Sequence, residues 1–376
     1  MKFIIIIEFL ILSLNIVAQP YFQQKVDFTI QVALNPTLKC LKGYEKITYY
    51  NYSSDTLYYI YFHLYPNATK SKTKTALAKQ MLYNNDYSLY YEDEKNLGFI
   101  DSLQFKVNGK NAHFSIVKDS LDIGILPLYK PLLPNEHIII ETPFYVKIPI
   151  AGLTRMGYYE SYFGITQWYP KPAVYDHAGW HPYPYLNDGE FYSEFGNFNV
   201  EITVPYDYTV AATGNLQDTS ELIHLNKLIA LSSQYSDSYD YKNALTNVNP
   251  TPQKFKTLRF IQNNIHDFAW FASPYFKVAK DSAIVNHKII YTYAFYSPEN
   301  HFIWQNAAKF VSDAVQYYST NVGPYPYQQC TAVEMPYITE GGMEYPTITS
   351  IGLYTNEYSL QNVILHEVGH NWFYGL

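Results

Sequence analysis

The sequence is poor in cysteine and in charge. Only two cysteines, Cys40 and Cys330, occur in 376 residues, which excludes a small domain held together by several disulfides. Two isolated cysteines in an exported chain are more often buried and reduced than bridged, so we expect two free thiols. Charged residues make up 16% of the chain, the net charge is −7 and no basic run occurs. Nucleic acid is therefore not expected as a partner.

Long apolar runs are also scarce. Only residues 3–17 form a mostly apolar stretch, which follows Met1-Lys2 and precedes Ala18. This pattern predicts a secretory signal over residues 1–18 and an exported protein, whether periplasmic, secreted or on the cell surface. An uncleaved membrane anchor and a buried strand are the alternatives, because Glu8 interrupts the run. No other segment approaches the ~20 apolar residues of a membrane span, so no stable span is expected after cleavage.

Tyrosine, in contrast, is abundant. The chain has 41 tyrosines, many in runs such as Tyr58-Tyr59-Ile60-Tyr61-Phe62, which suit half-buried strands. Short apolar segments separated by Asn-Pro, Pro-Asn and Asn-Gly pairs continue to about residue 297. The pattern predicts a mainly antiparallel β-domain over residues 19–297, with a polar loop or hairpin at residues 235–252.

The spacing of apolar residues changes after Ser297. Apolar residues then recur at helical spacing until Gly323-Pro324 ends the run. The recurring residues are Phe302, Ile303, Ala307, Phe310, Ala314 and Tyr317. We therefore place a domain boundary between residues 297 and 298, and predict an α/β domain over residues 298–376 with a buried strand at 329–335.

An H-E-x-x-H motif stands at residues 366–370. On a helix, His366 and His370 project from one face, one turn apart. Two imidazoles at that spacing can hold one Zn²⁺, and Glu367 can act as base toward a zinc-bound water. The alternative is a buried amphipathic helix whose two histidines are satisfied by the protein. Zinc is favoured, because a buried Glu beside two histidines needs a partner and a metal supplies one.

The residues around the motif support a helix. Ser359 is a good N-cap and precedes the apolar residues Leu360, Val363 and Ile364, which predicts a helix from about Ser359. A catalytic zinc normally takes three protein ligands and keeps one position for water or substrate. No third ligand follows His370 in the sequence. We therefore expect a chain that is inactive by itself and is the N-terminal part of a longer enzyme.

A second group of residues lies 22 positions before His366. Residues 339–346 read Thr-Glu-Gly-Gly-Met-Glu-Tyr-Pro. The paired glycines, Gly341 and Gly342, leave the backbone open, so an extended peptide can pair with it as an added strand. Glu344 would then offer a carboxylate to a cation at the end of that peptide. The alternative is a glycine-rich turn with a solvated glutamate.

Together the two motifs resemble those of the gluzincin aminopeptidases, the family of aminopeptidase N and leukotriene A4 hydrolase. That family has a G-x-M-E-N motif and an H-E-x-x-H motif with an aromatic pair after it. The resemblance is specific in residues 339–376 and extends to Gln167-Trp168-Tyr169-Pro170 and residues 190–205. It implies a mainly β N-terminal domain of saddle-like shape, followed by the start of a thermolysin-like α/β catalytic domain.

The resemblance also implies a zinc aminopeptidase that removes N-terminal residues from peptides. It implies Glu367 as catalytic base or acid, His366 and His370 as zinc ligands, and Glu344, Gly341, Gly342 and Gln167 as substrate-binding residues. Tyr345 stands where the family has Asn, and Tyr169 stands where it usually has a second polar residue. Two other functions stay open: a thermolysin-type endopeptidase, in which Glu344 binds no amine, and a non-catalytic binding protein on the same fold.

Overall fold

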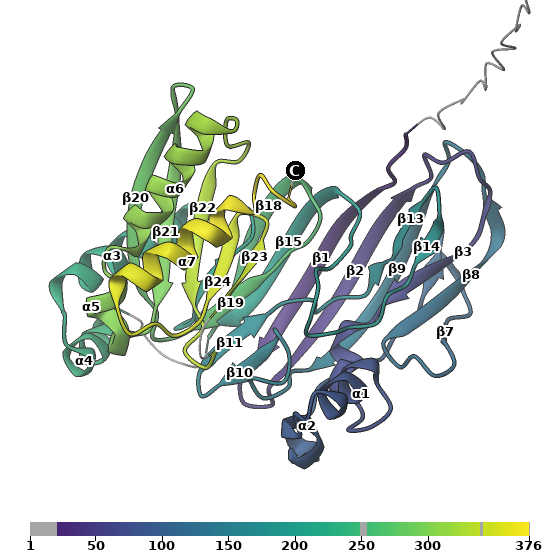
Figure 1. The fold of residues 1–376 in the computed structure, drawn as a ribbon, viewed down its shortest axis with the longest axis horizontal. Helices are drawn as coiled ribbons and strands as arrows, with labels where there is room; N and C mark the ends of the chain where they lie inside the picture. Colours follow the sequence, from purple (N-terminus) through teal and green to yellow (C-terminus); the bar gives the residue numbers. More distant parts are fainter. Residues whose placement is uncertain (1–20, 249–253, 339–340, 376) are drawn as a thin grey trace, which may run out of the picture.

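The computed structural model describes residues 21–248, 254–338 and 341–375. The predicted signal, residues 1–18, lies outside them, as do Thr339 and Glu340. The strands form two lobes (Figure 1). A β-lobe holds the sheets built from strands before residue 274, and an α/β lobe holds a five-stranded sheet with its helices. The strand-rich architecture predicted from the sequence is confirmed.

A nine-stranded sheet forms the centre of the β-lobe. Its order is β17 (Asn215–Leu216), β18 (Phe255–Ile265), β15 (Gly196–Pro205), β1 (Lys25–Asn35), β2 (Cys40–Tyr50), β9 (His137–Lys147), β5 (Lys106–Val107) and β6 (Lys110–Asn111), and β4 (Phe99–Asp101) also pairs with β9. Its pairs are antiparallel except β1 with β15. A parallel pair needs a long connection, and about 160 residues of chain separate these two strands.

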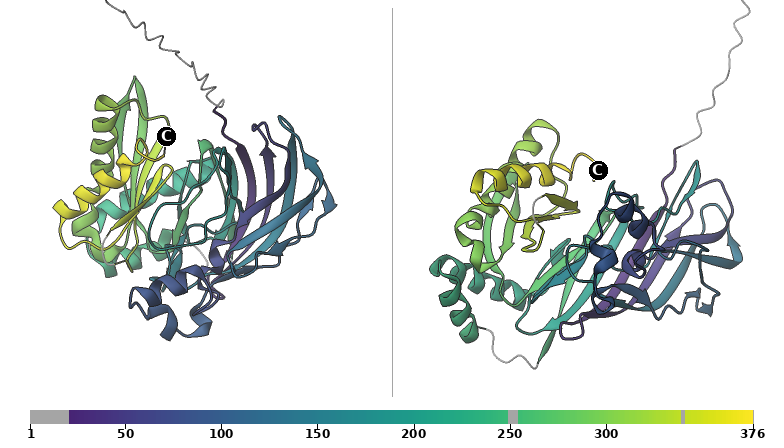
Figure 2. Two further views of the ribbon diagram at one scale, coloured as in Figure 1. Left: turned by 45° about the vertical axis from the view of Figure 1, so that its right-hand side comes forward. Right: turned by 60° about the horizontal axis from the view of Figure 1, so that its bottom comes forward.

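Smaller sheets complete the β-lobe. One has the order β10 (Gly157–Tyr159), β11 (Tyr162–Ile165), β19 (Trp270–Ser273) and β16 (Thr209–Ala212). Another has the order β12 (Lys171–Pro172), β3 (Leu57–His63), β8 (Ile123–Leu132) and β7 (Ser115–Ile116), and β13 (Val174–Asp176) pairs with β14 (Gly179–His181). Helices α1 (Ala76–Tyr83) and α2 (Ser88–Tyr91) project from this lobe, away from the C-terminal end (Figure 2).

The α/β lobe is built on a five-stranded sheet. Its order is β20 (Lys277–Val285), β21 (Lys288–Tyr296), β22 (Gln329–Glu334), β24 (Ile348–Ile351) and β23 (Gly342–Tyr345). Helix α6 (Ala307–Asn321) packs on β20, β21 and β22, and α7 (Glu357–Gly369) packs on α6, β23 and β24. A short helix, α5 (His301–Trp304), also contacts α7. The sheet therefore begins at residue 277 and crosses the position of the predicted domain boundary, residue 297.

Helices occupy a region that the sequence pattern assigned to strands and a loop. Helix α3 (Thr219–Gln234) packs on β20, and α4 (Ser238–Val248) packs on a 3-10 turn (Pro298–Asn300). The prediction of a loop or hairpin at 235–252 is therefore wrong for the described part of that segment. Leu225 and Leu228 of α3 and Tyr241 and Leu245 of α4 are buried at helical spacing. Packing against the second lobe stabilises these polar segments as helices.

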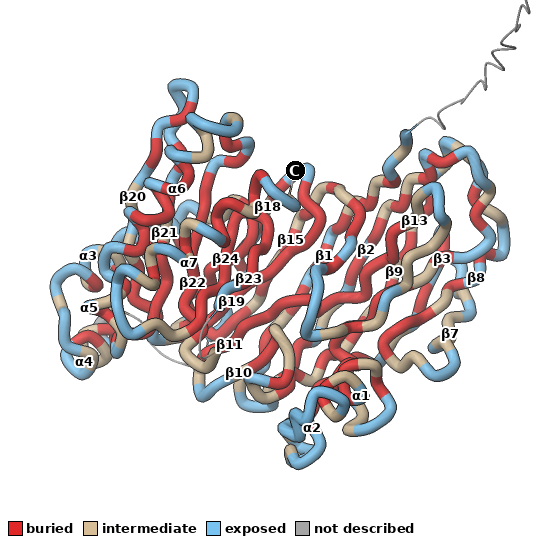
Figure 3. Tube along the Cα trace, viewed as in Figure 1, coloured by how far each residue is buried: buried red, intermediate tan, exposed pale blue. Residues whose placement is uncertain are grey.

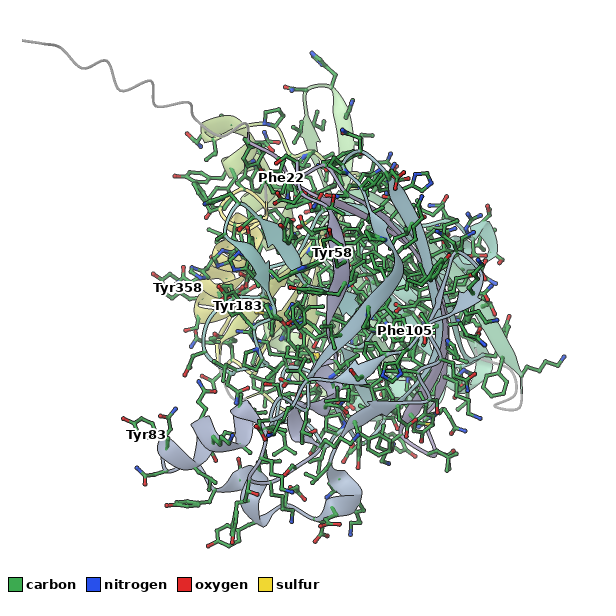
Figure 4. All side chains as sticks on the ribbon, turned by 90° about the vertical axis from the view of Figure 1, so that its right-hand side faces the viewer. Phe22, Tyr58, Tyr83, Phe105, Tyr183 and Tyr358 are labelled. Atoms are coloured by element: carbon green, nitrogen blue, oxygen red, sulfur yellow. The ribbon has the colours of Figure 1, made fainter. Side chains whose placement is uncertain are left out.

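The buried residues are concentrated in the strands. Most central strands of both lobes are buried along much of their length, and exposed residues gather at turns and on α1 and α2 (Figure 3). Both cysteines are buried and free, as predicted. Figure 4 shows Phe105 among crowded side chains, while Tyr83 and Tyr358 project from the surface. Across the described ranges, no helix has both the length and the apolar character needed to span a membrane.

Candidate active site

Helix α7 carries the H-E-x-x-H motif. Asn356, not Ser359, is its N-cap: the Asn356 side chain accepts a hydrogen bond of 2.8 Å from the Ser359 backbone N–H. The helix thus begins at Glu357, two residues earlier than predicted, because Asn caps a helix as well as Ser does. Leu360, Ile364 and Val368 are fully buried one turn apart. These three side chains fix the rotation of α7 and leave both histidines outside the core.

His366, in the last turn of α7, and His370, the C-cap of that helix, face each other. His366 Nε2 lies 3.2 Å from His370 Nε2. Two Zn–N bonds of about 2.0–2.1 Å at a tetrahedral angle place the two nitrogens roughly 3.3–3.4 Å apart. The observed separation fits a shared zinc ion without movement of the helix.

The protein fixes the tautomer of His370. Its Nδ1 lies 3.1 Å from the carbonyl oxygen of Phe373. A carbonyl only accepts, so Nδ1 carries the proton and Nε2 keeps a lone pair directed at His366. Metal-binding histidines are usually oriented by such a bond from the other ring nitrogen. The donor set at this end of α7 therefore fits zinc.

Two carboxylates lie beside the histidines. Ligand atoms of Glu344, Glu367 and His370 all lie within 4.8 Å of one another. Glu344 Oε1 and Glu367 Oε2 are buried and have no hydrogen-bond partner within the described ranges. Burial, together with the charge of Glu344, raises the pKa of Glu367 to about 7. Burial also raises the pKa of Glu344. Buried carboxylates without partners favour a cation at this point.

Strand β23 presents Glu344 from the edge of the five-stranded sheet, where only β24 pairs with it in the described part of the chain. The Gly352 N–H donates to the Gly341 carbonyl at 2.9 Å. Hydrogen-bonded pairs alternate along an antiparallel ladder, so the backbone groups of Gly342 and Glu344 point away from β24. The outer edge of β23 can therefore accept an added strand.

Gly341, just before β23, and Gly342, the first residue of β23, make different contacts. The Gly341 N–H donates to Tyr354 Oη at 2.9 Å, so both backbone groups of Gly341 are engaged within the chain. Its φ of +88° lies in the left-handed region that favours glycine. A Cβ on Gly342 would lie 2.5 Å from the Glu367 side chain. Gly342 thus lets the Glu367 carboxylate approach the β23 backbone.

The β-lobe brings Gln167 to β23. Gln167 is buried, and its Oε1 accepts a long hydrogen bond of 3.4 Å from the Tyr345 hydroxyl. Its Nε2 is buried without a described partner. Tyr169 points elsewhere, because its hydroxyl donates to Asp267 at 2.8 Å. The structure thus brings His366, Glu367, His370, Glu344, Gly342 and Gln167 to one region, and it places Tyr169 in the core.

Three residues near the site, Arg155, Glu190 and His266, are not among the predicted site residues, and of these only Glu190 lies in a segment that the resemblance covers. Arg155 Nη1 lies 3.7 Å from Glu190 Oε2, and the charges of both residues act on the pKa of Glu344 and of Glu367. His266, after β18, lines a small cavity with Glu344 and His370. These residues belong to no short motif and lie about 100–210 positions before the H-E-x-x-H motif, so only the fold brings them there.

A buried ion pair fixes the loop that carries His266. Asp267 Oδ2 lies 3.0 Å from Lys171 Nζ, and Asp267 Oδ1 accepts from Tyr169 Oη and the Phe268 N–H, each at 2.8 Å. Both charged side chains are about 95% buried. Burial alone would raise the pKa of Asp267, but the Lys171 ammonium and these hydrogen bonds lower it below its ordinary value. The carboxylate is therefore ionised and paired.

Comparison with known proteins shows the fold. No protein-family model and no curated protein matches the sequence. The M1 zinc metallopeptidase from Deinococcus radiodurans matches 94% of this chain with a TM-score of 0.55 and 14% sequence identity. Two mutant structures from the same organism match similarly, one with a TM-score of 0.56 and one, bound to a Tyr-Ser-Ala substrate, with a TM-score of 0.55. This chain spans 65% of the length of each matched chain.

Proposed function

We propose that this chain carries the zinc-binding motif of a zinc metallopeptidase, and that the enzyme is an aminopeptidase acting on peptides. One observation carries the proposal: the His366 and His370 Nε2 atoms lie 3.2 Å apart, beside two carboxylates that each have a buried oxygen without a hydrogen-bond partner in the described ranges. The matched fold of M1 zinc metallopeptidases supports it, as does a matched structure that holds a Tyr-Ser-Ala substrate. We also propose that the protein is exported.

His366 and His370 would hold the zinc ion, which when bound polarises a substrate carbonyl and lowers the pKa of a coordinated water. Glu367 is the proposed base. Its raised pKa, about 7, suits a group that takes up and returns a proton near neutral pH. Gly342 keeps the Glu367 carboxylate against the edge of β23, where an extended substrate would pair with the open backbone groups.

Glu344 is proposed to bind the substrate's terminal ammonium. Its Oε1 is buried without a hydrogen-bond partner in the described ranges, so an ammonium would supply the missing hydrogen bond and a full positive charge. Gln167, with a free amide Nε2 beside Tyr345, would contact the peptide next to that terminus. Anchoring the first residue places the first peptide bond at the reacting centre. In a thermolysin-type endopeptidase, the alternative, Glu344 would bind no amine.

Residues 1–376 alone are proposed to bind zinc weakly and not to turn over peptide, since their motif supplies two imidazoles and a catalytic zinc takes three protein ligands. The product of the natural gene is therefore the protein to assay. We expect zinc-dependent release of the first residue from a free-amine peptide, and little release from its N-acetylated form. Glu367→Gln should abolish release and keep zinc, while Glu357→Gln, on the exposed side of the same helix, should change neither.

If free-amine and N-acetylated peptides are cleaved at equal rates, the enzyme is an endopeptidase and not an aminopeptidase. Release that persists after the metal has been removed and its absence verified would contradict the zinc mechanism altogether.

A further inference from the structure

A small cavity lies where the two lobes meet at the site. Its volume is about 10 Å³, and its lining includes His266 from the β-lobe and Glu344, His370 and Tyr374 from the α/β lobe. A space of this size holds about one water-sized group. An ammonium group is of similar size. The cavity therefore suits one small polar group and excludes a side chain.

Most polar groups around this cavity already have partners. Tyr374 Oη donates to the Phe191 carbonyl, and Tyr327 Oη donates to the Asn264 carbonyl at 3.2 Å. The Asn371 side chain accepts from the Thr347 N–H and donates to the Val368 carbonyl. Two buried lining atoms, His266 Nδ1 and Glu344 Oε1, have no hydrogen-bond partner within the described ranges. The nearest opposite group to Glu344 Oε1 is His370 Nδ1, at 3.9 Å, beyond hydrogen-bond distance. A single group between them would satisfy both.

His266 is held firmly in place. Its ring centre lies 5.3 Å from that of Phe195 and 5.4 Å from that of Tyr374. The next residue, Asp267, is fixed by its ion pair with Lys171. Burial lowers the pKa of His266 to about 4, so the ring is neutral at pH 7 and one nitrogen keeps a lone pair. A rigid, neutral imidazole is a preorganised hydrogen-bond acceptor.

We propose that His266 is a substrate-binding residue that accepts a hydrogen bond from the same terminal ammonium that Glu344 binds. An ammonium has three N–H donors, so one carboxylate oxygen does not satisfy it. Glu344 supplies the charge, and His266 supplies a second acceptor without a second charge. The pair selects peptides with an unblocked primary amine over acetylated ones, and over secondary amines, which have one N–H fewer. This inference rests on the proposed function, because it assumes that Glu344 receives the ammonium.

The test is ligand binding to the 376-residue chain, measured by calorimetry with L-leucinamide and N-acetyl-L-leucinamide. His266→Phe keeps an aromatic ring between Phe195 and Tyr374 and removes both nitrogens. His266→Asn keeps a polar atom near the position of Nδ1. Glu344→Gln is the reference for the ammonium site, and His113→Phe, at an exposed position, is the matched control. Unchanged thermal unfolding verifies that each variant folds.

We expect wild type to bind L-leucinamide and not the acetylated form. His266→Phe should weaken binding about ten- to a hundred-fold, the range for a hydrogen bond to a charged group, and Glu344→Gln should weaken it at least as much. His266→Asn should recover most of the affinity, and His113→Phe should match wild type.

Two results would overturn the inference in distinguishable ways. If Glu344→Gln loses binding and His266→Phe does not, His266 has no role and the ammonium site of the proposed function stands. If wild type binds both ligands equally or neither, the ammonium site itself is wrong, and the role of His266 is wrong with it.

Discussion

Replacing Asp267 with Asn should strongly destabilise the protein, because it removes one half of a buried ion pair. Asp267 and Lys171 lie 3.0 Å apart and are about 95% buried, so the substitution leaves the Lys171 ammonium buried without its counter-charge. Breaking such a pair from one side typically costs about 3–5 kcal/mol. The same loop carries His266, so the loss should also loosen the junction between the lobes.

The cost is measured as the change in the free energy of unfolding in urea at pH 7. Asp313→Asn is the matched control, because the pair of Lys309 with Asp313 has a similar distance of 2.8 Å but is exposed. Asp313→Asn should lower the free energy of unfolding by about 0.5 kcal/mol or less. The double variant Lys171→Met with Asp267→Asn should recover most of the loss, since it leaves no unpaired charge.

The pH dependence of this cost follows from the pKa. The pKa of Asp267 is lowered from its ordinary value of 3.8, so the stabilisation is present above pH 3.8 and is lost as the pH falls through the folded-state pKa. The difference in the free energy of unfolding between wild type and Asp267→Asn should therefore become smaller in acid. If Asp267→Asn and Asp313→Asn lower the free energy of unfolding equally at pH 7, the buried ion pair does not contribute the stability assigned to it.

Three further predictions concern the site and one distant carboxyl. His366→Ala should weaken zinc binding by more than about a hundred-fold, beyond the loss typical of a residue that only orients a ligand, as measured by competition with a chelator. Gly342→Ala should displace Glu367, since the new Cβ would lie 2.5 Å from that side chain, and should lower turnover of the natural gene product while zinc content stays unchanged. Burial raises the pKa of Glu194 from 4.5 to about 8, so its proton stays bound in the folded state while the unfolded state loses it. The free energy of unfolding should therefore fall by up to about 4 kcal/mol between pH 4.5 and 8, and Glu194→Gln should flatten that slope in urea titrations.

The local part of the site could be predicted from the sequence. The spacing of His366 and His370 on one helix sets their separation, because helix geometry is independent of the rest of the fold. The start of that helix was placed at Ser359 and not at Glu357, since Ser359 and Asn356 are both good caps and only the observed hydrogen bond distinguishes them.

The non-local part could not be predicted. Arg155, Glu190 and His266 reach the site through strand pairing of the β-lobe, including the parallel pair of β1 with β15, and a single sequence does not specify such pairing. The sequence pattern does not predict helices α3 and α4, because their segments are polar and have few buried positions. These segments are helical because they pack against the second lobe. The predicted roles of Gly341 and Gly342 were alike, yet Gly341 bonds within the chain and Gly342 borders Glu367.

The most direct test of the central claim is a crystal structure of the 376-residue chain grown with zinc, with anomalous diffraction recorded at the zinc edge. We expect one ion bound by Nε2 of His366 and Nε2 of His370, at about 2.0–2.1 Å from each. We also expect that Glu367 does not ligate the ion and stays within reach of a coordinated water. A zinc ion bound elsewhere, or none between these two histidines at saturating zinc, would show that these histidines are not the zinc ligands.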